Sequence, residues 1–131
     1  MLGIDTNVLV RFLVRDDQAQ FEKARKLIRR EVAAARRVFV SQLVLMETEW
    51  ILRSRYGLPK IEIIAAVSGL LDATEIQFED EPAIEEALFM WKDSAADFAD
   101  CLIGARNRRL GCRVTATFDA KASKLAGFVA A

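Results

Sequence analysis

The sequence predicts an α/β fold in which short strands alternate with amphipathic helices. Short runs rich in apolar and β-branched residues recur along the chain, at residues 2–4, 36–40, 74–78 and 112–117. Segments with apolar residues at helical spacing follow the first three runs, which is the pattern of α/β proteins. With 131 residues and 53% hydrophobic content, residues 1–131 are expected to form one domain with a substantial core.

Composition limits the possible partners and compartments. Lys+Arg and Asp+Glu number 19 each, so no overall positive field attracts the chain to nucleic acid. Cys101 and Cys112 lack CxxC spacing and are predicted to be buried thiols in a reducing compartment. No leader peptide and no apolar window of about 18 residues is visible, so we expect a cytoplasmic protein without a membrane span.

The chain contains no histidine, and this restricts its chemistry. Ser-His and Cys-His nucleophiles, histidine general bases and histidine-ligated zinc are all excluded. If the protein is an enzyme, carboxylates are its expected catalytic groups, and converging carboxylates favour Mg²⁺ or Mn²⁺.

The first strand, residues 2–4, is followed directly by Asp5, Thr6 and Asn7 and then by a helix with Val8 on its apolar face. This places Asp5 at the carboxyl edge of a sheet, where ligands bind in open α/β sheets. The alternative is that Asp5 only caps the helix.

The next helix is predicted to begin after the Asp16-Asp17 pair, and Ser41 is expected to cap the helix after the strand at residues 36–40. Within the helix after Ser41, at about residues 42–56, Glu47 shares a face with Leu43, Trp50 and Ile51, whereas Glu49 points nearly the opposite way. This face is predicted to be buried, so Glu47 needs either a metal ion or a salt-bridge partner.

The middle of the chain is predicted to supply packing. After Pro59, one helical face carries apolar and small residues: Ile61, Ile64, Ala65, Ser68 and Leu71. Glu79, Asp80 and Glu81 suit the solvated start of a further helix. Trp50 and Trp91 are interpreted as core residues.

A helix at about residues 96–110 contains a second set of acids. Asp97 and Asp100 are i, i+3 neighbours, and Gly104 extends their face without a side chain. Asp97 alone is explained equally well by the helix dipole, but Asp100 is not. We expect an open niche beside Gly104 for a cation and a substrate.

The strand at residues 112–117 ends in Thr117-Phe118-Asp119, so Asp119 follows a strand end as Asp5 does. Two strand-edge carboxylates and two helix-borne sets can meet at one end of a parallel sheet. Residues 120–126 are predicted to be helical, and Phe128-Val129 to form a last edge strand.

Four motifs in order resemble those of PIN domains, and more narrowly those of VapC-type toxins of toxin-antitoxin pairs. They are Ile4-Asp-Thr-Asn-Val-Leu-Val-Arg11, Glu47 in Leu-Met-Glu-Thr-Glu-Trp, Asp97-Phe-Ala-Asp-Cys-Leu-Ile103 and Thr117-Phe-Asp119. The resemblance spans nearly the whole chain. It implies a PIN-like three-layer α/β/α fold, with a parallel sheet of four or five strands wrapped by about seven helices.

The resemblance also implies a Mg²⁺- or Mn²⁺-dependent endoribonuclease that forms a homodimer, or a hetero-oligomer with a small antitoxin that inhibits it. Carried over by position, the acidic quartet is Asp5, Glu47, Asp100 and Asp119. Metal ligands would be Asp5, Asp97, Asp100 and Asp119, with Asn7 and Thr117 as supporting polar groups.

Contacts to RNA phosphates are expected from Arg11, Arg15 and Arg106, and less specifically from Arg53, Arg108 and Arg109. The alternative for each arginine is an ordinary solvated surface position. The alternative function is a non-catalytic regulatory or RNA-binding module whose acids hold a structural cation. An aspartyl phosphatase is disfavoured because Asn7 stands where a second acid is usual.

Overall fold

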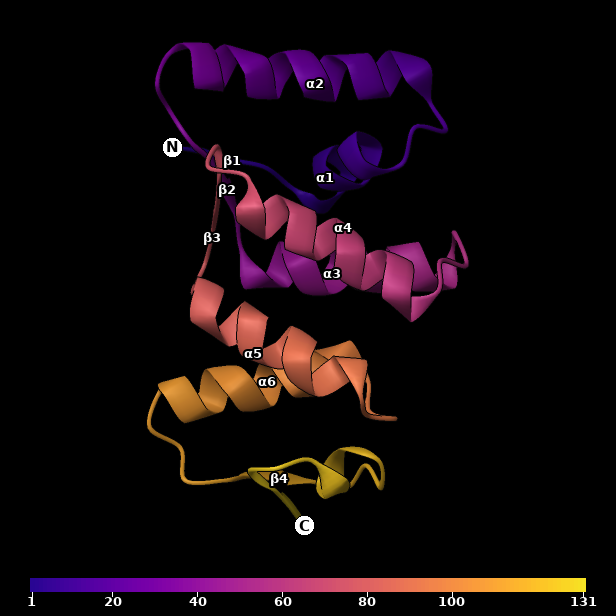
Figure 1. Ribbon diagram of the computed structural model, residues 1–131, viewed down its shortest axis with the longest axis vertical. Helices are drawn as coiled ribbons and strands as arrows, with labels where there is room; N and C mark the ends of the chain where they lie inside the picture. The colour runs from indigo at the N-terminus through magenta and orange to yellow at the C-terminus, as the bar shows by residue number, and fades with distance from the viewer. The chain divides into compact units, whose positions relative to one another are not determined.

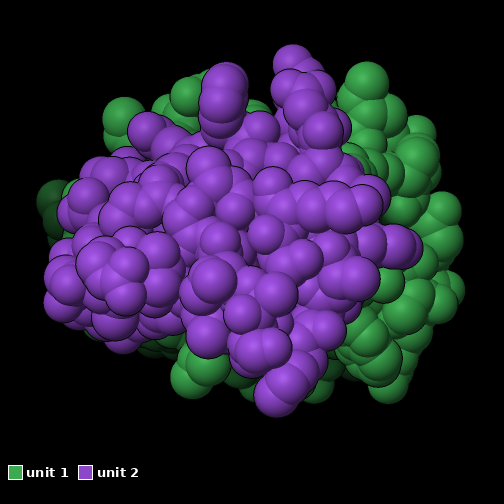
Figure 2. Space-filling view, turned by 90° about the horizontal axis from the view of Figure 1, so that it is seen from below, with its two compact units in different colours: residues 1–79 green, residues 80–131 purple.

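The computed structural model describes residues 1–131, and strands alternate with helices in its first part as predicted (Figure 1). Residues 1–79 and residues 80–131 each form a unit of their own (Figure 2). The first unit contains β1 (Leu2–Gly3), α1 (Thr6–Leu13), α2 (Gln18–Ala33), β2 (Val38–Val40), α3 (Gln42–Ser54), α4 (Lys60–Asp72) and β3 (Ile76–Phe78). The second contains α5 (Glu81–Lys92), α6 (Phe98–Arg109), β4 (Thr115–Thr117), the 3₁₀ helix η1 (Ala122–Lys124) and β5 (Phe128–Ala130).

The first unit is built on a parallel sheet with strand order β1-β2-β3. Val38 lies between Leu2 and Ile76 in the register, and each strand is joined to the next by helices, as parallel pairing requires. Val38 and Val40 are fully buried, whereas Phe39 between them is half-buried, as expected for a strand in which side chains alternate between two faces. Because the strands are parallel, Asp5, Ser41 and Glu79 all follow strand ends at the same edge of this sheet.

Side-chain caps fix the starts of three helices, as the sequence predicts. Asp5 accepts a hydrogen bond from the Val8 N–H at 3.1 Å, Asp17 from Gln20 at 3.0 Å, and Ser41 from Val44 at 3.2 Å. Each cap contributes about 1 kcal/mol by satisfying an otherwise unpaired amide.

The predicted packing face of α4 is wrong. Its buried residues are Ile63, Val67 and Leu70, whereas Ile61 is 76% exposed. Apolar residues occur on several sides of this helix, so periodicity does not select one face. The neighbours α3 and β3 select it, because α4 packs against both.

The second unit packs α5 against α6, and the rings of Trp91 and Phe98 lie 5.2 Å apart between their centroids. Strands β4 and β5 form a separate parallel pair with Thr115 opposite Phe128. The edge strand predicted at residues 128–129 is therefore confirmed. The helix predicted at residues 120–126 is reduced to η1.

The acids at the start of α5 are not simply solvated, which corrects the prediction. Asp80 adopts a left-handed backbone conformation with φ of 53° and pairs with Arg109 at 2.6 Å. Glu79 accepts a hydrogen bond from the Gln42 N–H at 2.9 Å, which links the end of β3 to the start of α3.

The α/β prediction is confirmed, with five parallel strands, six α-helices and one 3₁₀ helix. The strands divide into a three-stranded sheet and a two-stranded sheet. Cys101 is buried as predicted, but Cys112 is exposed. None of the helices has the length and apolar character needed to cross a membrane.

Candidate functional site

Asp5 is an exposed carboxylate at the carboxyl edge of the three-stranded sheet. Its Oδ1 caps α1, and its Oδ2 makes no hydrogen bond within the chain. Capping and a functional role are thus compatible, because the cap uses only one of the two oxygens.

Asp5, Asn7 and Glu47 come together in one cleft. The Asp5–Glu47 cleft has a volume of about 680 Å³ and lies between the start of α1 and one face of α3. Its lining residues are Asp5, Thr6, Asn7, Leu43, Val44, Glu47, Ile51 and Arg55. The helical face predicted for Glu47, with Leu43 and Ile51 beside it, is confirmed by this lining.

The predicted burial of that face is wrong. Leu43 is 79% exposed and Trp50 is 51% exposed, whereas Glu49 is only 2% exposed. Glu49 has the salt bridge that was considered for Glu47, because its Oε2 lies 2.8 Å from Arg53 Nε. Glu47 makes no ion pair or hydrogen bond within the chain, so its carboxylate remains available in the cleft.

The second unit holds the other three predicted acids. Asp97 is the N-cap residue of α6 without a side-chain capping bond, Asp100 lies in the first turn, and Asp119 follows β4. Burial raises the pKa of Asp100, and the negative charges of Asp119 and then Asp97 raise it further. These three carboxylates therefore interact electrostatically.

Thr117 and Asp119 form a local turn that fixes the Asp119 side chain. The Asp119 N–H donates to Thr117 Oγ1 at 3.0 Å, and Asp119 Oδ1 accepts from the Ala122 N–H at 2.8 Å. The Thr117 hydroxyl therefore holds the backbone of Asp119 in this turn.

The open niche predicted beside Gly104 is absent. A Cβ at this position would fall on the aromatic ring of Phe128 in β5. Gly104 is therefore needed for close packing of α6 against β5, and the space above it is filled.

The donor chemistry of both acidic groups fits a divalent cation. Nowhere in the structure are three or more Cys, Asp or Glu side chains gathered closely enough to enclose a metal ion. Mg²⁺, however, usually keeps several water ligands and binds through one or two carboxylates. Oxygen donors at like-charged sites such as Asp100 and Asp119 match that requirement.

A model of the PIN domain family matches residues 3–128. The chain belongs to the PIN domain family. The expected fold family is therefore confirmed, and the match includes all four motifs in which the predicted acids of this PIN domain lie.

Known proteins similar to this PIN domain include VapC proteins. A VapC ribonuclease of Aquifex aeolicus (strain VF5) is 24% identical over 122 residues, which covers 93% of this chain and 90% of that protein. Among solved structures, VapC20 of Mycobacterium tuberculosis, described as a toxin that cleaves the sarcin-ricin loop, is 24% identical with a TM-score of 0.44. That comparison covers 100% of this chain and 98% of VapC20.

Most arginines of this PIN domain have partners within the chain. Arg15 stacks on the Phe21 ring at 4.4 Å from its centroid, and Arg106 also has an internal interaction. Ion pairs with Asp or Glu are formed by Arg11, Arg25, Arg36, Arg53, Arg108 and Arg109. The prediction that Arg11, Arg15 and Arg106 bind RNA therefore applies to groups that also stabilise the fold.

Arg55 is a further cation of the Asp5–Glu47 cleft that was not predicted from the sequence. Its side chain lines the Asp5–Glu47 cleft and makes no ion pair within the chain. Its position on the same helical face as Glu47 could have been predicted, because Glu47, Ile51 and Arg55 follow one another at intervals of four residues.

Proposed function

We propose that this PIN domain is a metal-dependent endoribonuclease and the toxin of a toxin-antitoxin pair. The observation that carries the proposal is the Asp5–Glu47 cleft, where two exposed carboxylates without a cationic partner lie at the carboxyl edge of a parallel sheet. The similarity to the VapC ribonuclease of Aquifex aeolicus supports RNA as the substrate.

The acids form two overlapping proposed sets. The ligands of Mg²⁺ or Mn²⁺ would be Asp5, Asp97, Asp100 and Asp119. The catalytic set would be Asp5, Glu47, Asp100 and Asp119. The bound cation would lower the pKa of a water molecule and neutralise charge on the phosphodiester. Glu47 would orient that water and accept its proton, a role that needs a carboxylate without an internal cation.

Supporting residues would keep the acids in place. Thr117 holds the turn at Asp119 through its hydroxyl, and the Asn7 amide lies beside Asp5 in the same cleft. Arg55, at the side of this cleft, would contact the phosphate backbone of the RNA.

The remaining expectations concern assembly and location. We infer that residues 1–131 form a single PIN domain that acts in the cytoplasm, as a homodimer or as a hetero-oligomer with its antitoxin. The antitoxin would be a small protein that covers the acidic cleft, with an Arg or Lys placed among the carboxylates.

Asp5→Asn tests the nuclease proposal with the fold preserved. Asn is as good an N-cap as Asp, so α1 keeps its cap while the charge at the cleft is removed. Asp17→Asn makes the same change at the N-cap of α2, outside the Asp5–Glu47 cleft, and is the matched control.

With Mn²⁺, we expect the Asp5→Asn variant to lose RNA cleavage and Asp17→Asn to retain it, with both melting near wild type. Chelator should stop cleavage by the wild type. RNA binding without any cleavage by the wild type would instead favour the non-catalytic module.

A further inference from the structure

We propose that a second pocket, beside Asp5, binds a backbone phosphate of the RNA next to the bond that is cleaved; this deepens the proposed function and rests on it. The α1–α2 pocket has a volume of about 350 Å³. Its lining residues are Asp5, Asn7, Val8, Arg11, Gln20, Lys23, Ala24 and Leu27. Asp5 and Asn7 also line the Asp5–Glu47 cleft, so the two hollows meet at these residues.

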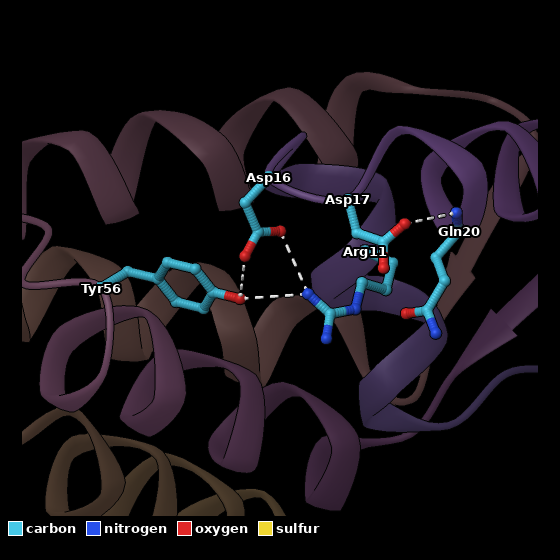
Figure 3. Close-up of polar contacts among 5 residues, drawn as sticks. All are labelled: Arg11, Asp16, Asp17, Gln20 and Tyr56. Atoms are coloured by element: carbon cyan, nitrogen blue, oxygen red, sulfur yellow. Dashed lines mark hydrogen bonds and ion pairs between the residues drawn. The ribbon is translucent and has the colours of Figure 1, made fainter.

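The guanidinium of Arg11 is fixed at this pocket by two neighbours (Figure 3). Its Nη1 donates to Asp16 Oδ1 at 3.0 Å and to the Tyr56 hydroxyl at 3.3 Å. The Tyr56 hydroxyl in turn donates to Asp16 Oδ2 at 3.0 Å. Arg11 Nε and Nη2 make no hydrogen bond within the chain, so a positioned donor pair remains for a ligand.

Other donors in the α1–α2 pocket are also unused. The Lys23 ammonium makes no ion pair, and the side-chain amides of Gln20 and Asn7 make no hydrogen bond within the chain. Of the lining charges, that of Arg11 is offset by its ion pair with Asp16, whereas Lys23 and Asp5 form no ion pair within the chain. The pocket therefore combines a lysine ammonium that has no ion-pair partner with several unused N–H donors, which is the chemistry that binds phosphate.

Lys23 in the α1–α2 pocket differs from several arginines of the chain in having no internal partner. Arg25, Arg36 and Arg53 lie against carboxylates of their own or adjacent elements, and Arg15 is stacked on Phe21. Arg11 is likewise paired with a carboxylate, that of Asp16, but two of its nitrogens are unused, and Lys23 in the same pocket has no anionic partner. A ligand with negative charge would satisfy both.

Lys23→Gln tests the proposal, with Lys26→Gln as the matched control. Both lysines are exposed on α2, and each change removes one positive charge, but only Lys23 lines the α1–α2 pocket. Binding of a short single-stranded RNA is measured by fluorescence anisotropy in chelator, where no cleavage is needed, over a range of salt concentrations.

We expect Lys23→Gln to weaken RNA binding several-fold more than Lys26→Gln does, and to reduce the slope of log K against log salt by about 0.7, the value for one lost phosphate contact with a single strand. Equal effects of the two changes would overturn the proposal. Because the assay is independent of turnover, a wild type that binds RNA through Lys23 but does not cleave it would refute the nuclease while supporting the phosphate pocket.

Tyr56→Phe distinguishes the effect of positioning Arg11 from the effect of its charge. It removes the hydroxyl that holds Arg11 while leaving every charge in place. RNA binding should weaken with an unchanged salt slope, and Arg11→Gln should change both. An affinity of Tyr56→Phe equal to that of wild type would overturn the proposal that the Tyr56 hydroxyl positions Arg11 for a ligand.

Discussion

The carboxylate of Glu49 is buried and lies 2.8 Å from the guanidinium of Arg53, one turn further along α3. Glu47, two residues earlier, faces the Asp5–Glu47 cleft instead. Two glutamates on one helix thus have different roles. Glu49 neutralises a cation beside the core, and Glu47 remains available for a ligand.

Glu47→Gln should therefore affect RNA cleavage, whereas Glu49→Gln should affect stability. Loss of the cleft carboxylate should reduce Mn²⁺-dependent RNA cleavage by about 100-fold or more, within the range of general acid–base catalysis, without changing the melting temperature. Glu49→Gln should retain cleavage but lose about 1–2 kcal/mol of unfolding free energy, because its charged hydrogen bond to Arg53 weakens. Gel-based cleavage and thermal melts measure both, and equal loss of cleavage would refute the assignment.

Asp100→Asn should trade activity for stability. The Asp100 carboxylate is partly desolvated and lies near the negative charges of Asp119 and Asp97, so its charge opposes folding when no metal is bound. In chelator the variant should melt at or above wild type, and it should gain less from added Mn²⁺ and lose RNA cleavage. A melting temperature well below wild type in chelator would instead make Asp100 a structural residue.

Asp16→Asn should change how stability depends on pH. The hydrogen bond from Tyr56 and the charge of Arg11 hold the pKa of Asp16 below its usual value, although partial burial opposes them. A carboxyl group with a lowered folded pKa stabilises the protein above its unfolded pKa of about 4, and the effect is lost as pH falls through the folded value. The variant should therefore be less stable than wild type near neutral pH, and urea unfolding should show the difference shrinking below about pH 4. A difference that is constant over this range would contradict the role of Asp16.

Two glycines in helices should respond in opposite directions to alanine. At Gly104 the added Cβ meets the Phe128 ring, so Gly104→Ala should cost about 1–3 kcal/mol of unfolding free energy. At Gly69 in α4 no atom lies within 4 Å of such a Cβ, so Gly69→Ala should stabilise by about 0.5–1 kcal/mol. Chemical denaturation measures both changes, and a stable Gly104→Ala would show that Phe128 moves aside easily.

The proposed antitoxin should suppress the nuclease. Purified as a complex, the protein should cleave RNA poorly, and removal of the partner should restore cleavage. An inhibitor that places a cation at Asp5 and Glu47 should also lose affinity for Glu47→Gln. A complex as active as the free protein would argue against this role.

Features that depend on neighbouring residues in the chain could be predicted from the sequence. The strand around Val38 and Val40 follows from alternation, and the caps at Asp5, Asp17 and Ser41 follow from short polar side chains before apolar runs. The motifs around the predicted acids were likewise sufficient for the family. The face shared by Glu47 and Ile51 followed from helical spacing.

Which helix faces are buried could not be predicted in this way, because burial depends on contacts between distant elements. Helical spacing relates Glu47 to Glu49 but cannot tell which of the two meets the core, and the packing of α3 buried Glu49. The buried face of α4 and the Phe128 ring at Gly104 likewise depend on elements distant in the sequence. Periodicity gives the angle between side chains on one helix, whereas burial depends on where that helix meets its neighbours, and those contacts form only when the chain folds.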